Sequence, residues 1–205
     1  MIQEFSIQLA SAWRTTSWTE IIAAVLAVAY LVLAIRQQLA CWAAAFVSSC
    51  LYVWVLFGAH LYMESALNAF YAAMAVYGYL QWQRGDAGSA RSVCRWPIGR
   101  HLAGLVGVLA LSAVNGFFLQ RYTPAASPFI DSMVTWSSVF ATFLVARKVY
   151  ENWHWFLVID TVSLCLYVNR RLYVTVLLFG LYLVLIVIGM RQWRRTLPSP
   201  AYAAA

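Results

Sequence analysis

Apolar residues follow one another along the chain in runs close to the length of a membrane-spanning helix, with short polar breaks between them. A bilayer core about 30 Å thick requires about 20 mostly apolar residues in each crossing helix. Runs of this kind lie at about 18–35, 40–57, 61–82, 101–120, 128–147, 154–169 and 172–190. The pattern predicts an all-α integral membrane protein with seven transmembrane helices.

The connections between these runs are short, except for the one from Gln83 to Arg100. Gly85, Gly88 and Pro97 indicate an irregular linker in this long connection. The order of segments that we expect is an N-terminal segment 1–17, three helices within 18–82, a linker 83–100, a linking helix 101–120, three helices within 128–193, and a tail 194–205.

Composition agrees with a membrane protein and excludes several other classes. Hydrophobic residues make up 63% of the 205 residues, charged residues make up 10%, and the mean hydropathy is +0.72. These values exclude a soluble domain, a disordered chain and a fibrous repeat. The net charge of +7 comes from Lys and Arg scattered over short loops, so we expect no nucleic-acid partner.

Residues for catalysis or metal binding are missing from the sequence pattern. His60, His101 and His154 lie at helix borders without metal-ligand spacing, and the four cysteines form no CxxC pair. No nucleophile motif or phosphate-binding glycine loop is present. We therefore expect free thiols, no metal, no cofactor and no enzymatic activity. The first seventeen residues lack the pattern of a removable signal peptide.

The distribution of positive charge predicts the direction of the chain in the membrane. Seven crossings place ten Lys and Arg residues on one side, and the other side holds Arg14, Arg121, Arg170 and Arg171. Short loops rich in Lys and Arg stay in the cytoplasm. The N-terminus is therefore predicted outside and the C-terminus in the cytoplasm.

The first three predicted helices align with the last three at one constant offset, without a gap. We call this shift, which places Glu20 over Asp131, the repeat offset. The matching pairs include polar and aromatic residues that a general apolar bias supplies poorly. They are Glu20 with Asp131, Arg36 with Arg147, Trp42 with Trp153, Tyr71 with Tyr182, Gly78 with Gly189, and Trp82 with Trp193. A linking helix between two such units gives a 3+1+3 parallel repeat, an architecture typical of transporters.

Particular motifs resemble the PnuC family of bacterial vitamin transporters over about residues 18–193. They are Pro128-Phe129-Ile130-Asp131-Ser132, Arg147-Lys148 followed by Glu151-Asn152-Trp153, Trp18 with Glu20, Leu61-Tyr62, Tyr77-Gly78 and Trp193. The resemblance implies a SWEET-like 3+1+3 fold in the bacterial inner membrane. It also implies uptake of nicotinamide riboside by facilitated diffusion, with intracellular phosphorylation trapping the substrate. Related subgroups carry thiamine or riboflavin.

Polar residues inside the predicted helices are the candidates for substrate binding. Asp160 lies near the middle of the sixth helix, where an acid is costly unless it binds a cation or is partnered. Glu64, Asn68 and Tyr71 share one face of the third helix. In the family that this chain resembles, the positions of Asp160 and Asn68 usually carry Asn and Gln.

Aromatic and pseudo-symmetric residues complete the candidate site. Trp136 and Trp155 are placed to stack on a flat cationic ring, while packing is the alternative for each. Ser49 aligns with Asp160 at the repeat offset, and Tyr52 is a weaker candidate. Beyond these, Glu20 and Asp131 at the outer ends of helices one and five are predicted to fix helix ends or to act in gating.

Several alternatives stay open on the sequence alone. Nicotinamide riboside and thiamine are both flat, hydroxyl-bearing cations, whereas neutral riboflavin is matched less well by buried acids. Asp160 or Glu64 would also suit a proton-coupled transporter. The sequence argues less strongly against a channel or a non-transporting receptor than against an enzyme. We expect lipid contacts and leave homo-oligomerisation open.

Overall fold

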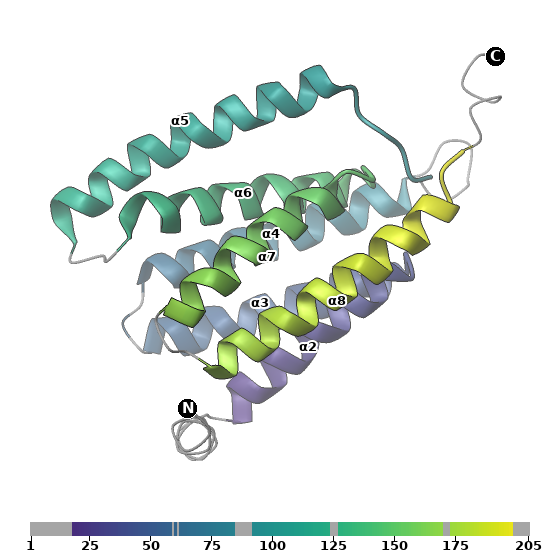
Figure 1. The fold of residues 1–205 in the computed structure, drawn as a ribbon. Helices are drawn as coiled ribbons and strands as arrows, with labels where there is room; N and C mark the ends of the chain where they lie inside the picture. The colour runs from purple at the N-terminus through teal and green to yellow at the C-terminus, as the bar shows by residue number, and fades with distance from the viewer. Residues whose placement is uncertain are drawn as a thin grey trace.

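The structure is a computed structural model that describes residues 18–58, 60, 62–84, 92–123, 127–169 and 173–198. This part of the chain is helical throughout, apart from its loops (Figure 1). The helices are α2 (Trp18–Ile35), α3 (Ala40–Gly58), α4 (Tyr62–Gln83), α5 (Ile98–Tyr122), α6 (Pro128–Ala146), α7 (Asn152–Asn169) and α8 (Tyr173–Arg195).

Each helix predicted from the apolar pattern is present, and most ends differ by one or two residues. The larger differences occur where a helix continues into polar residues. Helix α5 begins at Ile98 directly after Pro97, ahead of the predicted start at 101, and α8 continues through Arg194 and Arg195. Hydropathy marks the segment inside the bilayer, whereas a helix often extends beyond it into the interface.

The helices differ in how apolar they are. Within the described residues, α3, α5, α6 and Thr175–Arg195 of α8 are each long and apolar enough to cross a membrane by length and composition. The apolar part of α2 is shorter, and α4 and α7 carry more polar side chains. Polar residues in a spanning helix require a protein-lined or water-filled surface, so α4 and α7 are expected to face the inside of the bundle.

Of the helices that the structure describes, six form a closed ring, and α5 lies outside it. Helix α3 packs between α2 and α4, and α7 packs between α6 and α8. The ring closes where α4 meets α6 and where α2 meets α8. Helix α5 packs mainly on α6 and contacts α7 through the His101–Trp155 hydrogen bond, and Figure 1 shows it at the edge of the bundle, far from α2 and α3.

One end of the ring carries the α2–α3 and α6–α7 loops, residues 92–97 and the C-terminal end of α8 (Figure 1). We call it the basic end, because Arg36, Arg147, Lys148, Arg194 and Arg195 lie there. Four buried indoles fill the ring at this end. This tryptophan cluster consists of Trp42, Trp82, Trp153 and Trp193.

Contacts in the tryptophan cluster occur twice with nearly the same geometry. Trp42 meets Trp82 edge to face at 5.4 Å between centroids, and Trp153 meets Trp193 edge to face at 5.4 Å. The two pairs touch through Trp82 and Trp193, whose centroids are 6.2 Å apart. Edge-to-face packing at such separations adds to the stabilisation from burial.

Hydrogen bonds from the same indoles cross between the two sides of the ring. Trp82 Nε1 donates to the Val145 carbonyl at 3.0 Å, and Trp193 Nε1 donates to the Ala34 carbonyl at 3.1 Å. The two bonds are counterparts, because the repeat offset places Trp82 over Trp193 and Ala34 over Val145. Each half of the chain therefore holds the end of the other half's first helix.

Close helix approach behind the cluster also occurs in both halves. Gly78 lies against the ring of Trp42, and Gly189 lies against the ring of Trp153. A Cβ at either glycine would overlap the indole, so only glycine permits this approach. The loops before the two tryptophans also correspond, since Gln37 and Lys148 have φ values of 55° and 52°.

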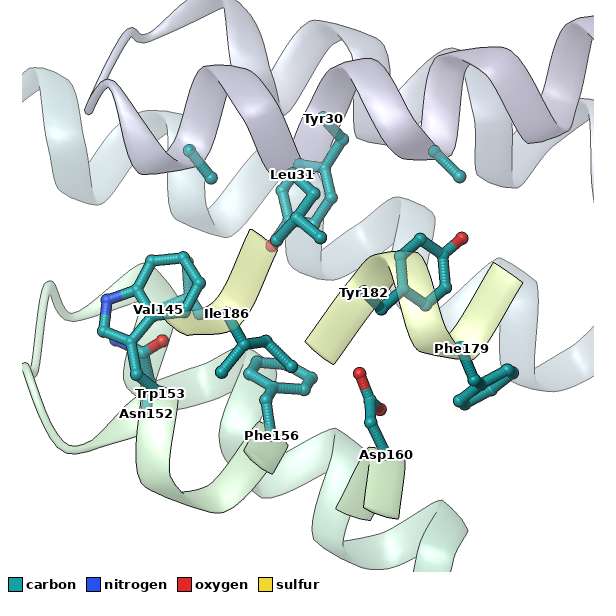
Figure 2. A pocket seen from close by; sticks show the side chains of 12 residues that line it. Tyr30, Leu31, Val145, Asn152, Trp153, Phe156, Asp160, Phe179, Tyr182 and Ile186 are labelled. Atoms are coloured by element: carbon teal, nitrogen blue, oxygen red, sulfur yellow. The ribbon is translucent and has the colours of Figure 1, made fainter. Parts of the chain in front are cut away.

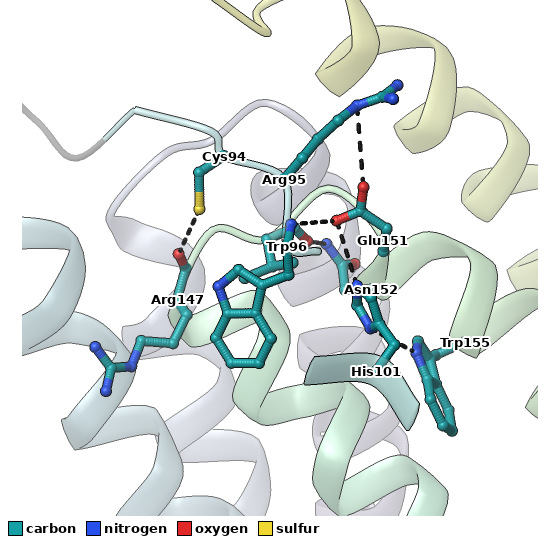
Figure 3. A network of polar contacts seen from close by, with 9 residues as sticks. Cys94, Arg95, Trp96, His101, Arg147, Glu151, Asn152 and Trp155 are labelled. Atoms are coloured by element: carbon teal, nitrogen blue, oxygen red, sulfur yellow. Dashed lines mark hydrogen bonds and ion pairs between the residues drawn. The ribbon is translucent and has the colours of Figure 1, made fainter. Parts of the chain in front are cut away.

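Residues 92–97 dock against the α6–α7 loop (Figure 3). Cys94 N donates to the Lys148 carbonyl at 3.0 Å, and Tyr150 N donates to the Cys94 carbonyl at 2.8 Å. Glu151 accepts from the backbone N–H of Trp96 at 3.2 Å and lies 3.9 Å from Arg95 Nε. The described end of the predicted linker is thus fixed in position before α5 begins.

Candidate functional site: a central cavity with one carboxylate

A cavity of about 220 Å³ lies inside the ring, between α2 on one side and α7 and α8 on the other (Figure 2). Most of its wall is apolar. Its lining residues are Ala27, Tyr30, Leu31, Ala34, Val145, Asn152, Trp153, Phe156, Asp160, Phe179, Tyr182 and Ile186.

Asp160 is the one charged side chain among these lining residues. It is 8% exposed, and Figure 2 shows its carboxylate pointing from α7 into the cavity between Phe156 and Phe179. Within the described part of the chain, its carboxylate has no hydrogen-bond or ion-pair partner. A buried carboxylate without a protein cation is costly, so the cavity favours a positively charged occupant.

Aromatic side chains from three helices form the wall around this carboxylate. Tyr30 comes from α2, Phe156 from α7, and Tyr182 with Phe179 from α8 (Figure 2). Tyr182 and Asp160 are close enough to interact electrostatically. Flat apolar faces beside a single negative charge suit a planar cation, which ring faces attract by about 0.5–2 kcal/mol.

The tryptophan cluster closes the cavity toward the basic end. Trp153 lines the cavity itself, and so do Ala34 and Val145, whose carbonyls accept the hydrogen bonds from Trp193 and Trp82. The ring of Trp82 also lies 4.5 Å from Lys148 Nζ. The crossing hydrogen bonds therefore lie between the cavity and the basic end.

Three residues predicted from sequence lie close to the cavity without lining it. Tyr71 on α4 hydrogen-bonds with Ser138 and lies near Tyr30. Tyr52 on α3 lies within electrostatic reach of Tyr182. Ser49 is buried on α3, one of the ring helices that does not contribute to the cavity wall.

Two predicted residues on α4 lie away from the cavity. Asn68 donates through Nδ2 to the Glu64 carbonyl at 2.9 Å, within its own helix. Glu64 is exposed in the first turn of α4, near the end opposite the basic end. The shared face predicted for Glu64, Asn68 and Tyr71 therefore brings only Tyr71 near the central residues.

The two predicted tryptophans also lie outside the cavity lining. Trp155 Nε1 donates to His101 Nδ1 at 3.4 Å, and its ring packs edge to face on Phe140 at 4.9 Å (Figure 3). It therefore joins α7 to α5 and α6. Trp136 on α6 has a buried indole nitrogen without a hydrogen-bond partner in the described part of the chain.

The predicted helix-end pair is described only in part. Asp131 lies in the first turn of α6 and lines a second, smaller cavity between α6 and α7. Glu20 lies within α2, but its side chain is outside the described residues.

Several residues that line the central cavity were not predicted from the sequence. Tyr182 could have been predicted, because it aligns at the repeat offset with Tyr71, which was a candidate. No sequence feature distinguishes Tyr30, Phe156 and Phe179, since an aromatic residue in an apolar helix is equally typical of packing. Among the described residues, no group of three or more His, Cys, Asp or Glu side chains is arranged to hold a metal ion.

The sequence profile of the nicotinamide mononucleotide transporter family matches residues 17–195, which is nearly the whole chain. The chain belongs to this family. Its similarity to PnuC proteins confirms the resemblance found in the motifs, and the relatives are transporters and not enzymes.

Two curated relatives and one solved structure cover most of the chain. The riboflavin/roseoflavin transporter RibM of Streptomyces davaonensis is 27% identical over 183 residues, 86% of this chain and 84% of RibM. The nicotinamide riboside transporter PnuC of Escherichia coli is 24% identical over 203 residues, covering 86% of this chain and 85% of PnuC.

The crystal structure of the vitamin B3 transporter PnuC has the same fold. It superposes with a TM-score of 0.71 at 19% identity and covers 95% of this chain and 88% of that one. The protein is therefore an all-helical, multi-pass membrane transporter of the PnuC family.

Proposed function

We propose that the protein takes up nicotinamide riboside by facilitated diffusion through the central path, and that phosphorylation inside the cell then traps the substrate. The observation that carries this proposal is the single carboxylate of Asp160 inside an aromatic cavity. Nicotinamide riboside has a planar pyridinium ring, so it supplies the positive charge that the carboxylate otherwise lacks.

The aromatic wall supports a specific arrangement of the substrate. The pyridinium ring lies against Tyr30, Phe156 and Tyr182, with its positive charge toward Asp160. A phosphorylated nucleotide would bring negative charge to the same carboxylate and is rejected. Because rejection works in both directions, a phosphorylated product stays in the cell.

The transport cycle that we infer follows from a 3+1+3 parallel repeat of the SWEET type, with α2–α4 and α6–α8 as its units and α5 as the linking helix. The twofold contacts of the tryptophan cluster support this interpretation. Rocking one unit against the other opens the cavity alternately to each side. With the basic end in the cytoplasm, the cluster is the closed inner barrier.

Two other vitamins are alternatives. Thiamine is also a flat cation with a hydroxyl group, and it fits the same charge argument. Riboflavin is favoured by the similarity to RibM, but it is neutral and gains nothing from Asp160. Dependence of binding on the Asp160 charge therefore separates the cationic vitamins from riboflavin.

Equilibrium binding to the purified protein in detergent tests this proposal. Nicotinamide riboside, thiamine, riboflavin and nicotinamide mononucleotide are titrated into the wild type and into Asp160→Asn. We expect the riboside to bind the wild type, to bind Asp160→Asn at least about tenfold more weakly, and the mononucleotide not to bind. Binding of riboflavin alone, unchanged in Asp160→Asn, would contradict the proposal.

A further inference from the structure

A second cavity, of about 180 Å³, lies between α6 and α7 on the side of Asp160 away from the basic end. Four of its six lining residues are polar, in contrast to the mostly apolar wall of the central cavity. The lining residues are Asp131, Val134, Thr135, Ser163, Leu166 and Tyr167.

Helical spacing places this outer cavity on the same path as the central one. On α7, Asp160, Ser163 and Tyr167 are three and four residues apart and share a face. On α6, Thr135 lies on the face of Ser138, which hydrogen-bonds with Tyr71 beside the central cavity. Both helices therefore present the two cavities in line along one inward surface.

Ring contacts join the two cavities. Phe179 lines the central cavity, and its ring centroid lies 5.0 Å from Tyr167 of the outer cavity. The same ring lies 5.6 Å from Tyr182, which stands beside Asp160. These contacts form a continuous row of aromatic rings from the outer cavity to the central one.

The hydroxyl groups of this outer cavity differ from others on the same helices. Ser138 and Thr142 donate to carbonyls of their own helix at 2.8 Å each. Ser163 and Thr135 have no hydrogen-bond partner among the described residues, although Ser163 is only 2% exposed. Ser163 and Thr135 both line the outer cavity, so a polar ligand in this cavity is an available hydrogen-bond partner for their hydroxyl groups.

We propose that this outer cavity is a second substrate site, which binds the sugar hydroxyls of the incoming vitamin before its ring reaches Asp160. The inference rests on the proposed function. The hydroxyls of Ser163 and Thr135 can each donate and accept a hydrogen bond, and the carboxylate of Asp131 is a further acceptor in the same cavity, which suits the adjacent hydroxyls of a ribose. Asp131 then has a role in recognition besides its place at the start of α6.

Uptake by purified protein in proteoliposomes tests the outer site with the double variant Thr135→Val/Ser163→Ala. The probes are nicotinamide riboside as substrate and 1-methylnicotinamide, the same cation without the sugar, as competitor. The matched control is Thr161→Val/Ser112→Ala, because Thr161 is exposed on the other face of α7 and Ser112 lies on α5, outside the ring.

We expect the double variant to raise the KM for the riboside about tenfold, from the loss of two hydrogen bonds, and to leave competition by 1-methylnicotinamide unchanged. An unchanged KM, or an equal weakening of both probes, would overturn the outer site while leaving the proposed function in place. A wild type that takes up no riboside would overturn both.

Discussion

The two halves of the ring, α2–α4 and α6–α8, have the same residues where helices approach closely and different residues around the central cavity. Behind the tryptophan cluster, Gly78 and Gly189 make the same contact with an indole. At mid-depth, Ser49 in the first half corresponds to Asp160 in the second at the repeat offset. The contacts of the frame occur in both halves, whereas the charged side chain of the central cavity comes from the second half alone.

Under the proposed function, this difference lets a bundle with two similar halves bind an asymmetric ligand. Tyr52 in the first half corresponds to Ser163, and Asn68 corresponds to Phe179. The second half thus contributes the carboxylate of Asp160 and the hydroxyl of Ser163, while the first half contributes Tyr30 from across the ring. A single vitamin molecule needs only one set of such groups.

The largest effect is expected from removing the charge that distinguishes the halves. Asp160→Asn lowers the initial rate of nicotinamide riboside uptake about 100-fold, because a cation then enters an apolar cavity without a counter-charge. The matched change in the other half, Ser49→Ala, lowers uptake no more than about threefold. Uptake is measured in proteoliposomes. An equal loss of uptake rate in the two variants would contradict the proposed difference between the halves.

The next largest effect is expected at the glycine–indole contacts that occur in both halves. Gly78→Ala and Gly189→Ala each lower the free energy of unfolding by about 1–3 kcal/mol, because the new Cβ overlaps a buried indole. Thermal unfolding in detergent measures this loss. Gly180→Ala is the control, since a Cβ there meets nothing within 4 Å. A melting temperature for Gly78→Ala equal to that of Gly180→Ala would contradict the shared frame.

A smaller effect is expected at the crossing hydrogen bonds. Trp82→Phe or Trp193→Phe removes one indole N–H and favours opening of the basic end by about 1 kcal/mol, or about fivefold in population. Cys41, fully buried beside Trp42, reports this opening in a background with Cys50, Cys94 and Cys165 changed to serine.

Labelling of Cys41 by a water-soluble thiol reagent should accelerate by that factor in both variants. Trp54→Phe serves as the control, because Trp54 is 78% exposed on the outside of the bundle. An acceleration in only one of the two variants would show that the barrier is not twofold.

The smallest effect is expected outside the ring. Glu151→Gln weakens the contacts with Arg95 and His101 but keeps an acceptor for the Trp96 N–H, so stability falls by no more than about 1 kcal/mol. Glu151→Ala removes the acceptor as well and lowers the melting temperature further. A larger loss for Glu151→Gln than for Gly78→Ala would contradict this order.

Much of the fold could be predicted from the sequence, because helix position depends on local hydropathy. The ends of α2 matched at both Trp18 and Ile35. The repeat offset matched Trp42 with Trp153 and Trp82 with Trp193, but the sequence did not predict that the four indoles pack together in one cluster. The crossing hydrogen bonds could not be predicted, since the acceptors are backbone carbonyls and carry no residue signature.

The site was harder to predict, because it depends on the rotation of each helix about its axis. Asp160 was identified by its charge alone. Trp155 is only five residues away on the same helix, yet it points toward α5 and α6. Only tertiary packing sets which face of α7 turns inward. Tyr30 has no polar neighbour in sequence that would mark it as part of the wall of the central cavity.

The most direct measurement compares nicotinamide riboside with its reduced form, which has nearly the same shape but a neutral ring, in binding to the wild type and to Asp160→Asn. The account predicts that the wild type binds the oxidised cation at least about tenfold more tightly than the reduced form, and that Asp160→Asn removes this preference. Equal binding of the two forms by the wild type would contradict it.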